Sequence, residues 1–272
     1  MTPCQATVII PTTADRGALL RHSVASVLNQ TLRDIEVIII GDGVSNEAKK
    51  IIAELKRADP RIVFHDFPKH ERRGEPYRHQ VIKESRGNNI FYLCDRDLML
   101  PYHLDVVSGL LTTYNFAFTT FINVQKDKSL NIDQNVAYFG AGSHVDVKNR
   151  EVGSLSCVGH TREMYDCLQH GWRTTPKGEY TDIYMWKQFV EHPACQVYSA
   201  VNPTILYFKR GDHPGDPIDV RAKELEFWSK EISTQQGIDN INATAFAGLL
   251  LERRALRNFR DKAISERLSL KP

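Results

Sequence analysis

The sequence NIFYLCDRDLMLP at residues 89–101 carries the strongest structural signal in the chain. Its apolar residues 90–94 have the length and bulk of a buried β-strand. The strand ends at two acids, Asp95 and Asp97, and Pro101 then opens a predicted helix. Acids at the carboxyl end of a buried strand lie where α/β proteins bind ligands, and two carboxylates there suit a divalent cation. The alternative is a solvated turn in which Asp95 caps the following helix.

The composition is that of an ordinary globular protein. A chain of 272 residues with 42% hydrophobic and 25% charged residues can form one large domain or two small ones. The formal charge of +2 gives no signal for nucleic-acid binding. No run approaches the roughly 18 apolar residues of a membrane span, and the N-terminus lacks the pattern of a secretory signal. The five cysteines are scattered without a C-x-x-C pair, which argues against structural zinc and disulfides and predicts a reduced, cytoplasmic setting.

The first hundred residues alternate predicted strands with predicted helices. Apolar runs predict strands at residues 6–10, 35–40 and 61–65. Helical spacing of apolar residues predicts helices that begin near Gly17 and Ser45. This alternation indicates βαβ units and a mostly parallel sheet.

Polar residues follow three of the predicted strands. Thr12, Asp42 and Asp95 each stand just beyond the apolar run of a strand. Right-handed crossovers bring the ends of parallel strands to one edge of the sheet. We therefore expect these three side chains to line a single crevice.

Four short motifs follow one another in this half of the chain. They are VIIPT at residues 8–12, SVLNQT at residues 26–31, EVIIIGDG at residues 36–43, and the D-x-D at residues 95–97 with its following Leu-Pro. In this order they resemble the family-2 glycosyltransferases. The resemblance implies an α/β GT-A fold, which is the nucleotide-diphospho-sugar transferase fold with a Rossmann-like, mostly parallel sheet. It also implies inverting transfer of a sugar from a nucleotide-sugar, expected to be UDP-linked, to a glycan or lipid-linked acceptor.

The resemblance assigns donor-side residues to matching positions. Pro11, Thr12 and Thr13 would contact the nucleoside. Asp42 would accept a hydrogen bond from the base, expected to be uracil. Asp95 would approach the ribose and a Mn²⁺ or Mg²⁺ ion, and Asp97 would ligate that ion.

The chain departs from the family pattern at three donor-side positions, one of which is His79, where many members have Asn after the Arg. Gly41 replaces the first acid of the usual Asp-Asp pair and leaves Asp42 to bind the base. Arg96 stands between the two acids, where many members of the family have another acid. Arg96 could contact the diphosphate, but a solvated turn residue is the simpler interpretation.

A strongly basic segment lies between Asp66 and Arg86. Its basic residues are Lys69, His70, Arg72, Arg73, Arg78, His79 and Lys83. The functional interpretation is a segment that helps to neutralise the donor diphosphate, and Arg73 and Arg78 are the expected ligands. An exposed face of a helix that begins near Pro76 explains most of the other charges.

One acid in the second half of the chain is the candidate general base. Asp182 lies in the first turn of a helix predicted from about residue 180, where an acid also interacts favourably with the helix dipole. The resemblance matches Asp182 to the family's acceptor-side base, although Thr181 replaces the usual preceding Glu. An acceptor hydroxyl must lose its proton as it attacks the anomeric carbon, so the chemistry requires such a base.

Other polar and aromatic residues are candidates for the acceptor side. His160, Trp172 and Glu179 are expected to contact the acceptor, with a structural position as the alternative for His160. Residues 123–155 are expected to form loops with one strand at residues 136–139. His213 lies in a Gly- and Pro-flanked loop and is a candidate metal ligand, with a surface turn as the alternative.

The sequence predicts a GT-A domain at residues 1–217 and a helical extension at residues 218–272. The nucleotide-binding half of the domain would span residues 1–112 and the acceptor-binding half residues 113–217. One face of the extension carries Leu249, Leu256, Phe259, Ala263 and Leu270 beside several arginines. Packing onto the domain is the default expectation for such a stripe. A homodimer contact and a weak contact with the inner membrane surface are the alternatives.

Two further functions fit parts of the pattern. A nucleotidyltransferase also needs paired acids and Mg²⁺, but it would carry a Gly-rich basic loop where this chain has PTTAD at residues 11–15. A non-catalytic nucleotide-sugar-binding module would tolerate the changes at Gly41, Arg96 and Thr181. Such a module would bind the nucleotide-sugar without turnover and would be indifferent to the loss of Asp182.

Overall fold

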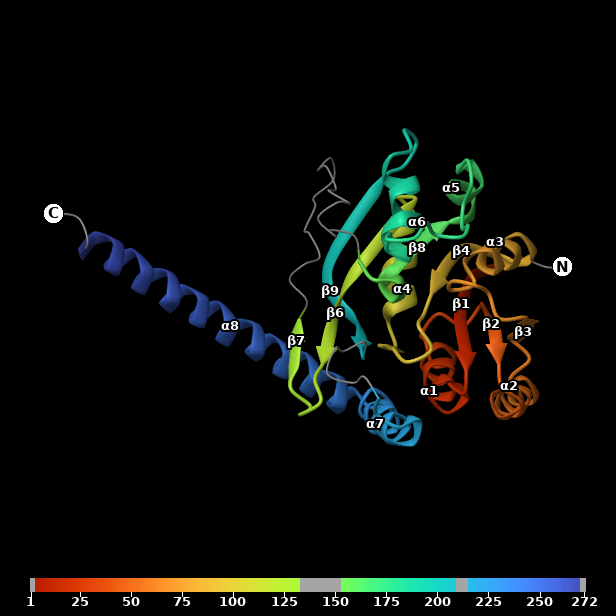
Figure 1. The fold of residues 1–272 in the computed structure, drawn as a ribbon, viewed down its shortest axis with the longest axis horizontal. Coiled ribbons are helices and arrows are strands. Elements are labelled where there is room, and N and C mark those ends of the chain that lie inside the picture. Colours follow the sequence, from red (N-terminus) through yellow and green to blue (C-terminus); the bar gives the residue numbers. More distant parts are fainter. Residues whose placement is uncertain (1–2, 133–152, 209–214, 270–272) are drawn as a thin grey trace.

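The protein was analysed as a computed structural model that describes residues 3–132, 153–208 and 215–269. A nine-stranded sheet forms the centre of the described part, in the order β3-β2-β1-β4-β8-β6-β9-β5 with β7 beside β6 (Figure 1). The strands are β1 (Cys4–Ala14), β2 (Ile35–Val44), β3 (Ile62–Phe67), β4 (Gly87–Tyr92), β5 (Leu98–Met99), β6 (Phe116–Val124), β7 (Leu130–Ile132), β8 (Val158–Thr161) and β9 (Val197–Tyr207). The helices are α1 (Gly17–Leu28), α2 (Asn46–Ala58), α3 (Glu75–Glu84), α4 (His103–Leu111), η2 (Leu155–Cys157), α5 (Arg162–Cys167), α6 (Thr181–Val190), α7 (Ile218–Glu231) and α8 (Gln235–Ser269). The strand expected at residues 136–139 lies outside the described residues.

The N-terminal half of the sheet is parallel, as the alternation of strands and helices predicts. β1 pairs in parallel with β2 and with β4, and β2 pairs in parallel with β3. Neighbouring side chains of β1 pack on opposite faces, with Val8 and Ile10 in one hydrophobic cluster and Ile9 in another. Both faces of the strand are buried, which explains why its sequence is continuously apolar rather than alternating.

The C-terminal half of the sheet mixes directions. β8 lies antiparallel between β4 and β6, and β6 pairs in parallel with β9. The short strand β5 pairs antiparallel with the end of β9, through Leu98 and Leu206. The chain that follows the D-x-D motif is therefore fixed against the far edge of the sheet.

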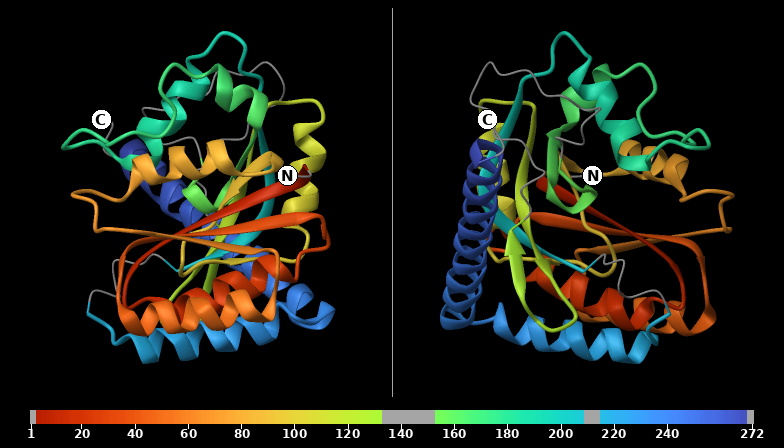
Figure 2. Two further views of the ribbon diagram at one scale, coloured as in Figure 1. Left: turned by 90° about the vertical axis from the view of Figure 1, so that its right-hand side faces the viewer. Right: turned by 60° about the vertical axis from the view of Figure 1, so that its left-hand side comes forward.

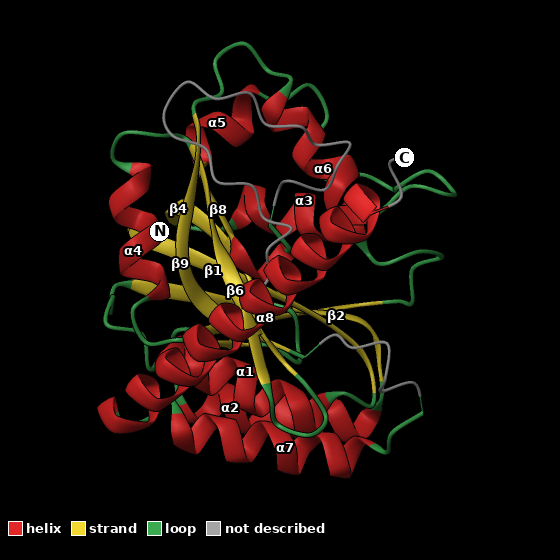
Figure 3. Cartoon of the chain, turned by 90° about the vertical axis from the view of Figure 1, so that its left-hand side faces the viewer, coloured by secondary structure: helices red, strands yellow, loops and turns green. Residues whose placement is uncertain are grey.

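Helices cover both faces of the sheet (Figures 2 and 3). The apolar residues of α1, α2 and α4 pack in one hydrophobic cluster, and those of α3, α5 and α6 pack in the other. Trp186 and Phe189 on α6 are fully buried against Phe116 of β6. The predicted apolar stripe of α6 is thus part of the core.

β1 and β2 extend beyond their predicted ends. Pro11 pairs with Ile40, and Thr13 pairs with Asp42, so residues expected to form turns are the last residues of strands. The pairing of β1 with β4 ends at Ile9. Pro11 lacks a backbone N–H, and no ladder hydrogen bond to β4 is lost at this position. These strand ends carry polar side chains to the edge of the sheet.

The C-terminal extension is helical, as predicted, and its first part packs on the domain. Trp228 of α7 and Ile241 of α8 are buried in a cluster that includes Leu19 of α1. The rest of α8 extends away from the body (Figure 1). The prediction that its apolar stripe packs onto the domain is wrong, because Leu256 and Phe259 are 57% and 75% exposed. Contacts of this stripe with a second copy or with a membrane surface stay predictions.

We expect two Phe→Ala substitutions to separate the core from the exposed part of α8. Phe189→Ala removes a fully buried ring and should lower the free energy of unfolding by about 3–5 kcal/mol. Phe259→Ala removes an exposed ring and should change it by less than about 0.5 kcal/mol. Urea denaturation of both variants measures this difference, and equal losses would contradict the described packing of α6 or α8.

Candidate functional site

A cavity of about 530 Å³ opens at the carboxyl ends of β1, β2 and β4. Its wall includes all eight residues expected to bind the nucleotide, together with the candidate base. These residues are Pro11, Thr12, Thr13, Asp42, Arg73, Arg78, Asp95, Arg96 and Asp182. The structure therefore brings together side chains that are up to 171 positions apart in the sequence.

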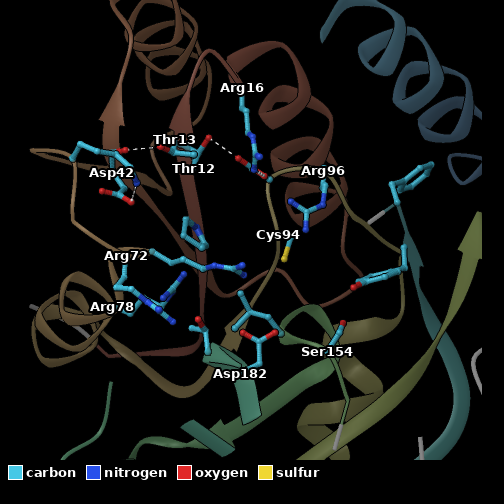
Figure 4. A pocket seen from close by; sticks show the side chains of 18 of the residues that line it. Thr12, Thr13, Arg16, Asp42, Arg72, Arg78, Cys94, Arg96, Ser154 and Asp182 are labelled. Atoms are coloured by element: carbon cyan, nitrogen blue, oxygen red, sulfur yellow. Dashed lines mark hydrogen bonds and ion pairs between the residues drawn. The ribbon is translucent and has the colours of Figure 1, made fainter. Parts of the chain in front are cut away.

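Hydrogen bonds join the three strand ends at this edge. The Thr12 hydroxyl donates to Asp95 Oδ2 at 2.9 Å, and the Thr13 hydroxyl donates to the carbonyl oxygen of Asp42 at 2.7 Å (Figure 4). The first bond links β1 to the segment after β4, and the second links β1 to β2. Thr12, Asp42 and Asp95 line one crevice, as the strand order predicts.

Asp42 is a nearly buried acceptor at the end of β2. Its Oδ1 accepts the backbone N–H of His70 at 2.6 Å, and its Oδ2 accepts Lys69 Nζ at 2.5 Å. Gly43 has a φ of 66°, and a Cβ at that position would lie 2.6 Å from Lys69 Cβ. The glycine is therefore what permits Lys69 to approach the carboxylate.

The basic segment divides between the cavity and the surface. Lys69, Arg72, Arg73 and Arg78 line the cavity. By contrast, His79 contacts the Tyr165 hydroxyl at 2.9 Å and lies away from it. Of these four residues only Arg78 belongs to α3, and it is buried, so the interpretation as an exposed helix face is wrong for Arg78.

Arg78 is the most buried cation of this segment. Only 5% of the residue is exposed, and its guanidinium lies 4.8 Å from the centre of the Trp172 ring. Its Nε and Nη1 find no hydrogen-bond partner among the described residues. Burial lowers the pKa of Arg78, while the charges of Asp182 and Glu75 oppose that shift. Arg78 therefore retains unused donors beside the candidate base.

Asp182 lies in the first turn of α6 and faces the cavity from the wall opposite the strand ends (Figure 4). Behind it, the Thr181 hydroxyl donates to Glu75 Oε1 at 3.4 Å. Glu75 is fully buried at the start of α3, and its Oε2 accepts the backbone N–H of Arg73 at 3.0 Å. Glu75 thus connects the start of α3 to the start of α6. This role was not predicted from the sequence, although Glu75 stands next to the predicted helix start near Pro76.

The two acids of the D-x-D motif face different surroundings. Asp95 lines the cavity, where its Oδ1 also lies 3.3 Å from Arg16 Nη1. Asp97 is fully buried and is not among the described residues of the cavity wall. Its Oδ2 accepts the Ser156 hydroxyl at 2.6 Å, and its Oδ1 accepts the backbone N–H of Phe208 at 3.1 Å. Asp97 thus connects the turn to η2 and to the end of β9.

Among the described residues, the two acids of the motif do not offer the expected Mn²⁺ or Mg²⁺ ion a pair of carboxylates in the cavity. Asp97 points away from the cavity, so the expected metal contact of this residue is wrong. Asp95 is already engaged by Thr12 and Arg16. Cys94 also lines the cavity, but its sulfur is a soft donor, whereas Mn²⁺ and Mg²⁺ prefer oxygen ligands. The described residues contain no group of three or more His, Cys, Asp or Glu side chains that could hold a metal ion, and His213 lies outside them.

Arg96, which stands between these two acids in the sequence, lines the cavity (Figure 4). It is half-buried, and its Nε finds no hydrogen-bond partner in the part of the chain that the structure describes. Burial opposes its charge, but Cys94, Asp97 and Asp95 raise the pKa of Arg96. The interpretation of Arg96 as a solvated turn residue is therefore wrong.

Two arginines of the wall were missed from the sequence. Arg16 is the residue before α1, and Arg221 belongs to α7 of the C-terminal extension. Arg16 lies outside the recognised motifs, so no sequence pattern marked it as a candidate site residue. No local pattern places Arg221 at the edge of the sheet, because its position depends on the packing of α7 on α1.

The three expected acceptor contacts do not lie on the cavity wall. His160 is fully buried, accepts the Tyr92 hydroxyl at Nε2 and donates from Nδ1 to the carbonyl oxygen of Thr161, at 2.7 and 3.0 Å. Trp172 is also buried and donates from Nε1 to the same Tyr92 hydroxyl at 2.9 Å. The acceptor assignments of His160 and Trp172 are therefore wrong, because both are linked core residues. Glu179 is exposed outside the described cavity wall.

Comparison with known sequences matches residues 7–136 to the family described as glycosyl transferase family 2. An uncharacterized glycosyltransferase of Methanocaldococcus jannaschii is 32% identical over 99 residues, which cover 36% of this chain and 34% of that protein. The GalNAc(5)-diNAcBac-PP-undecaprenol beta-1,3-glucosyltransferase of Campylobacter jejuni is 26% identical over 106 residues, which cover 39% of this chain and 32% of that protein. The matched regions thus span about a third of each relative.

Solved structures show the same fold at low sequence identity. The structure of S. aureus TarS 1-349 in complex with UDP-GlcNAc has a TM-score of 0.62 and 11% identity, and the match covers 90% of this chain and 71% of that one. The mannosyltransferase PcManGT from Pyrobaculum calidifontis, in complex with GDP-Man and Mn²⁺, has a TM-score of 0.54 and 13% identity, covering 100% of this chain and 82% of that one. The chain therefore has the GT-A fold that its motifs imply.

The burial of His160 predicts a pH dependence of stability. Burial lowers the pKa of His160 to about 3, whereas an unfolded histidine titrates near 6.5. Between these values the unfolded state binds the proton and the folded state does not, so stability is retained above pH 6.5 and decreases as the pH falls. From pH 7.5 to pH 5 this one residue should remove about 2 kcal/mol of unfolding free energy.

The variant His160→Gln isolates this contribution, because all other titrating groups remain. Its unfolding free energy, measured by urea denaturation, should decrease by about 2 kcal/mol less than that of the unmodified protein over the same pH interval. The same decrease in both proteins would show that His160 titrates normally, as expected of a side chain in a hydrated acceptor pocket.

Proposed function

Because residues 7–136 belong to glycosyl transferase family 2, we propose that this protein transfers a sugar from a nucleotide-sugar to an acceptor hydroxyl. One observation carries the proposal: a single cavity contains both the polar strand ends of the nucleotide-binding half and the carboxylate of Asp182. Sugar transfer needs these two parts together, because the donor and the base that activates the acceptor must meet at the anomeric carbon.

The nucleoside would bind along the ends of β1 and β2. Pro11, Thr12 and Thr13 form this part of the wall, and Asp42 lies beside them. A carboxylate offers about four acceptor positions, and the bonds from Lys69 and His70 occupy two of those of Asp42. Asp42 can therefore still accept an N–H of a base such as uracil. A UDP-linked donor is supported by the UDP-GlcNAc complex of S. aureus TarS, which shares the fold.

Asp182 would act as the general base from the acceptor side. As it removes the proton of the acceptor hydroxyl, the oxygen attacks the anomeric carbon and forms the new glycosidic bond. The bond from that carbon to the diphosphate oxygen breaks, and the electron pair leaves with the nucleoside diphosphate. A single displacement from the opposite face inverts the configuration at the anomeric carbon. Arg78 lines the same cavity, and the charge of Asp182 opposes the lowering of the Arg78 pKa by burial.

A glycan or lipid-linked molecule is the proposed acceptor class. The relative from Campylobacter jejuni, which is 26% identical over 106 residues, is named for an undecaprenol-linked acceptor. None of the described helices is both long and apolar enough to cross a membrane. No metal-dependent step is part of the proposal, because the described acids do not form a suitable ligand pair.

The substitution Asp182→Asn tests the assigned base. The amide cannot take a proton, and the rate of sugar transfer should fall by a factor of about 10²–10⁴. Binding of the donor nucleotide should remain, since the nucleoside contacts lie at the strand ends. Release of nucleoside diphosphate from UDP- and GDP-sugars, with glycan and polyprenyl-diphosphate-sugar acceptors, measures the rate.

A matched control is Glu191→Gln, which neutralises an exposed acid that follows the last turn of the same helix. This variant should retain the rate of the unmodified protein. Full activity of Asp182→Asn would contradict the proposed mechanism. Binding without any turnover in the unmodified protein would favour a non-catalytic binding module.

A further inference from the structure

Resting on the proposed function, we propose that three guanidinium groups, those of Arg16, Arg96 and Arg221, bind the donor diphosphate in place of a divalent metal ion. We call these residues the arginine trio. They come from the start of α1, the segment between β4 and β5, and α7, and all three line the same cavity. The trio gives the site a positive charge that belongs to the protein itself.

Among the described residues of the cavity wall, cations outnumber carboxylates, and the two acids of the motif do not form a pair of metal ligands. The described residues of its wall include seven Arg or Lys side chains and three carboxylates. Within this wall, Asp95 is engaged by Arg16, and the second acid of the motif is turned into the core. Several guanidinium groups would therefore repel a divalent cation in the cavity. The nearby carboxylate of Asp95 is already paired with Arg16.

The members of the trio lie within electrostatic reach of one another. Burial lowers the pKa of Arg221, and the charges of Arg96 and Arg16 are the next largest causes of that shift. Arg96 also has an unpartnered Nε among the described residues. Like charges gathered around a partly buried cavity indicate the binding site of an anion, because an anion would relieve both the repulsion and the missing hydrogen bond.

A diphosphate suits this arrangement. Guanidinium groups bind phosphate oxygens through two parallel N–H bonds, and such charge-assisted bonds are about twice as strong as neutral ones. The diphosphate ester gains one negative charge when the sugar leaves. Fixed cations at the oxygen of the leaving group therefore stabilise the transition state more than the bound donor.

Arg96 explains how a metal ion could be replaced without changing the charge of the site. An acid with charge −1 and a bound divalent cation contribute a net +1, which is the charge of one guanidinium group. Arg96 alone thus supplies a net charge of +1. An acid at the same position would supply that charge only together with a bound divalent metal ion.

Isothermal titration calorimetry with UDP and GDP as probes tests the proposal. The unmodified protein should bind one of these nucleotides with the same affinity, within about twofold, in EDTA and in Mn²⁺ or Mg²⁺. Arg96→Ala should raise its Kd about 10- to 100-fold, because charge-assisted bonds to a phosphate are lost. Arg221→Ala should also raise it, and provides a second test if Arg96→Ala does not fold.

The matched control is Arg257→Ala, which removes an exposed arginine on the distal part of α8. Its Kd should equal that of the unmodified protein. The substitution Arg96→Asp should abolish binding in EDTA and create a requirement for Mn²⁺, because it restores an acid between the two acids of the motif. An unchanged Kd in Arg96→Asp under both conditions would overturn the proposal.

The outcomes for the unmodified protein separate the two proposals. Binding that requires Mn²⁺ or Mg²⁺ would overturn the role of the arginine trio and leave glycosyl transfer intact. Binding of neither nucleotide under any condition would overturn the proposed function and the trio together. Metal-independent binding that is weakened by Arg96→Ala and Arg221→Ala supports both.

Discussion

The parallel pairing of β1 with β2 and β4 is the constraint on which the rest of the structure depends. It brings three polar strand ends to one edge, where hydrogen bonds from Thr12 and Thr13 hold them together. The strands must be buried on both faces for this edge to form, and the helices on each face provide that burial. The proposed contacts of Pro11, Thr12, Thr13 and Asp42 with the nucleoside follow from the position of this edge.

The turn after β4 connects the two halves of the protein. Its second acid, Asp97, is directed inward and holds η2 and the end of β9, whereas Asp95 and Arg96 remain on the cavity wall. Successive side chains of a tight turn point in different directions, so two acids separated by one residue need not share a ligand. In this chain the D-x-D pattern marks the turn after β4, and its two acids face different surroundings.

The sequence predicted the nucleotide-binding half well because its signals are local. Continuous apolar runs gave the strands, and ordered motifs gave the family and the crevice. The errors concern residues whose position depends on distant packing. His160 and Trp172 are bound in the core through Tyr92, and Arg221 reaches the site only because α7 packs on α1. The prediction that the apolar stripe of α8 packs on the domain was wrong because an apolar pattern does not show whether the domain has a surface to cover it.

A crystal structure of the protein with UDP or GDP, grown once with EDTA and once with Mn²⁺, would test the central claim most directly. We expect the base beside Asp42 and the diphosphate between Arg16, Arg96 and Arg221, at the same position in both crystals. A nucleotide bound away from the edge formed by β1, β2 and β4 would contradict the proposed donor site. A metal ion ligated by Asp95 and the diphosphate would contradict the role of the three arginines.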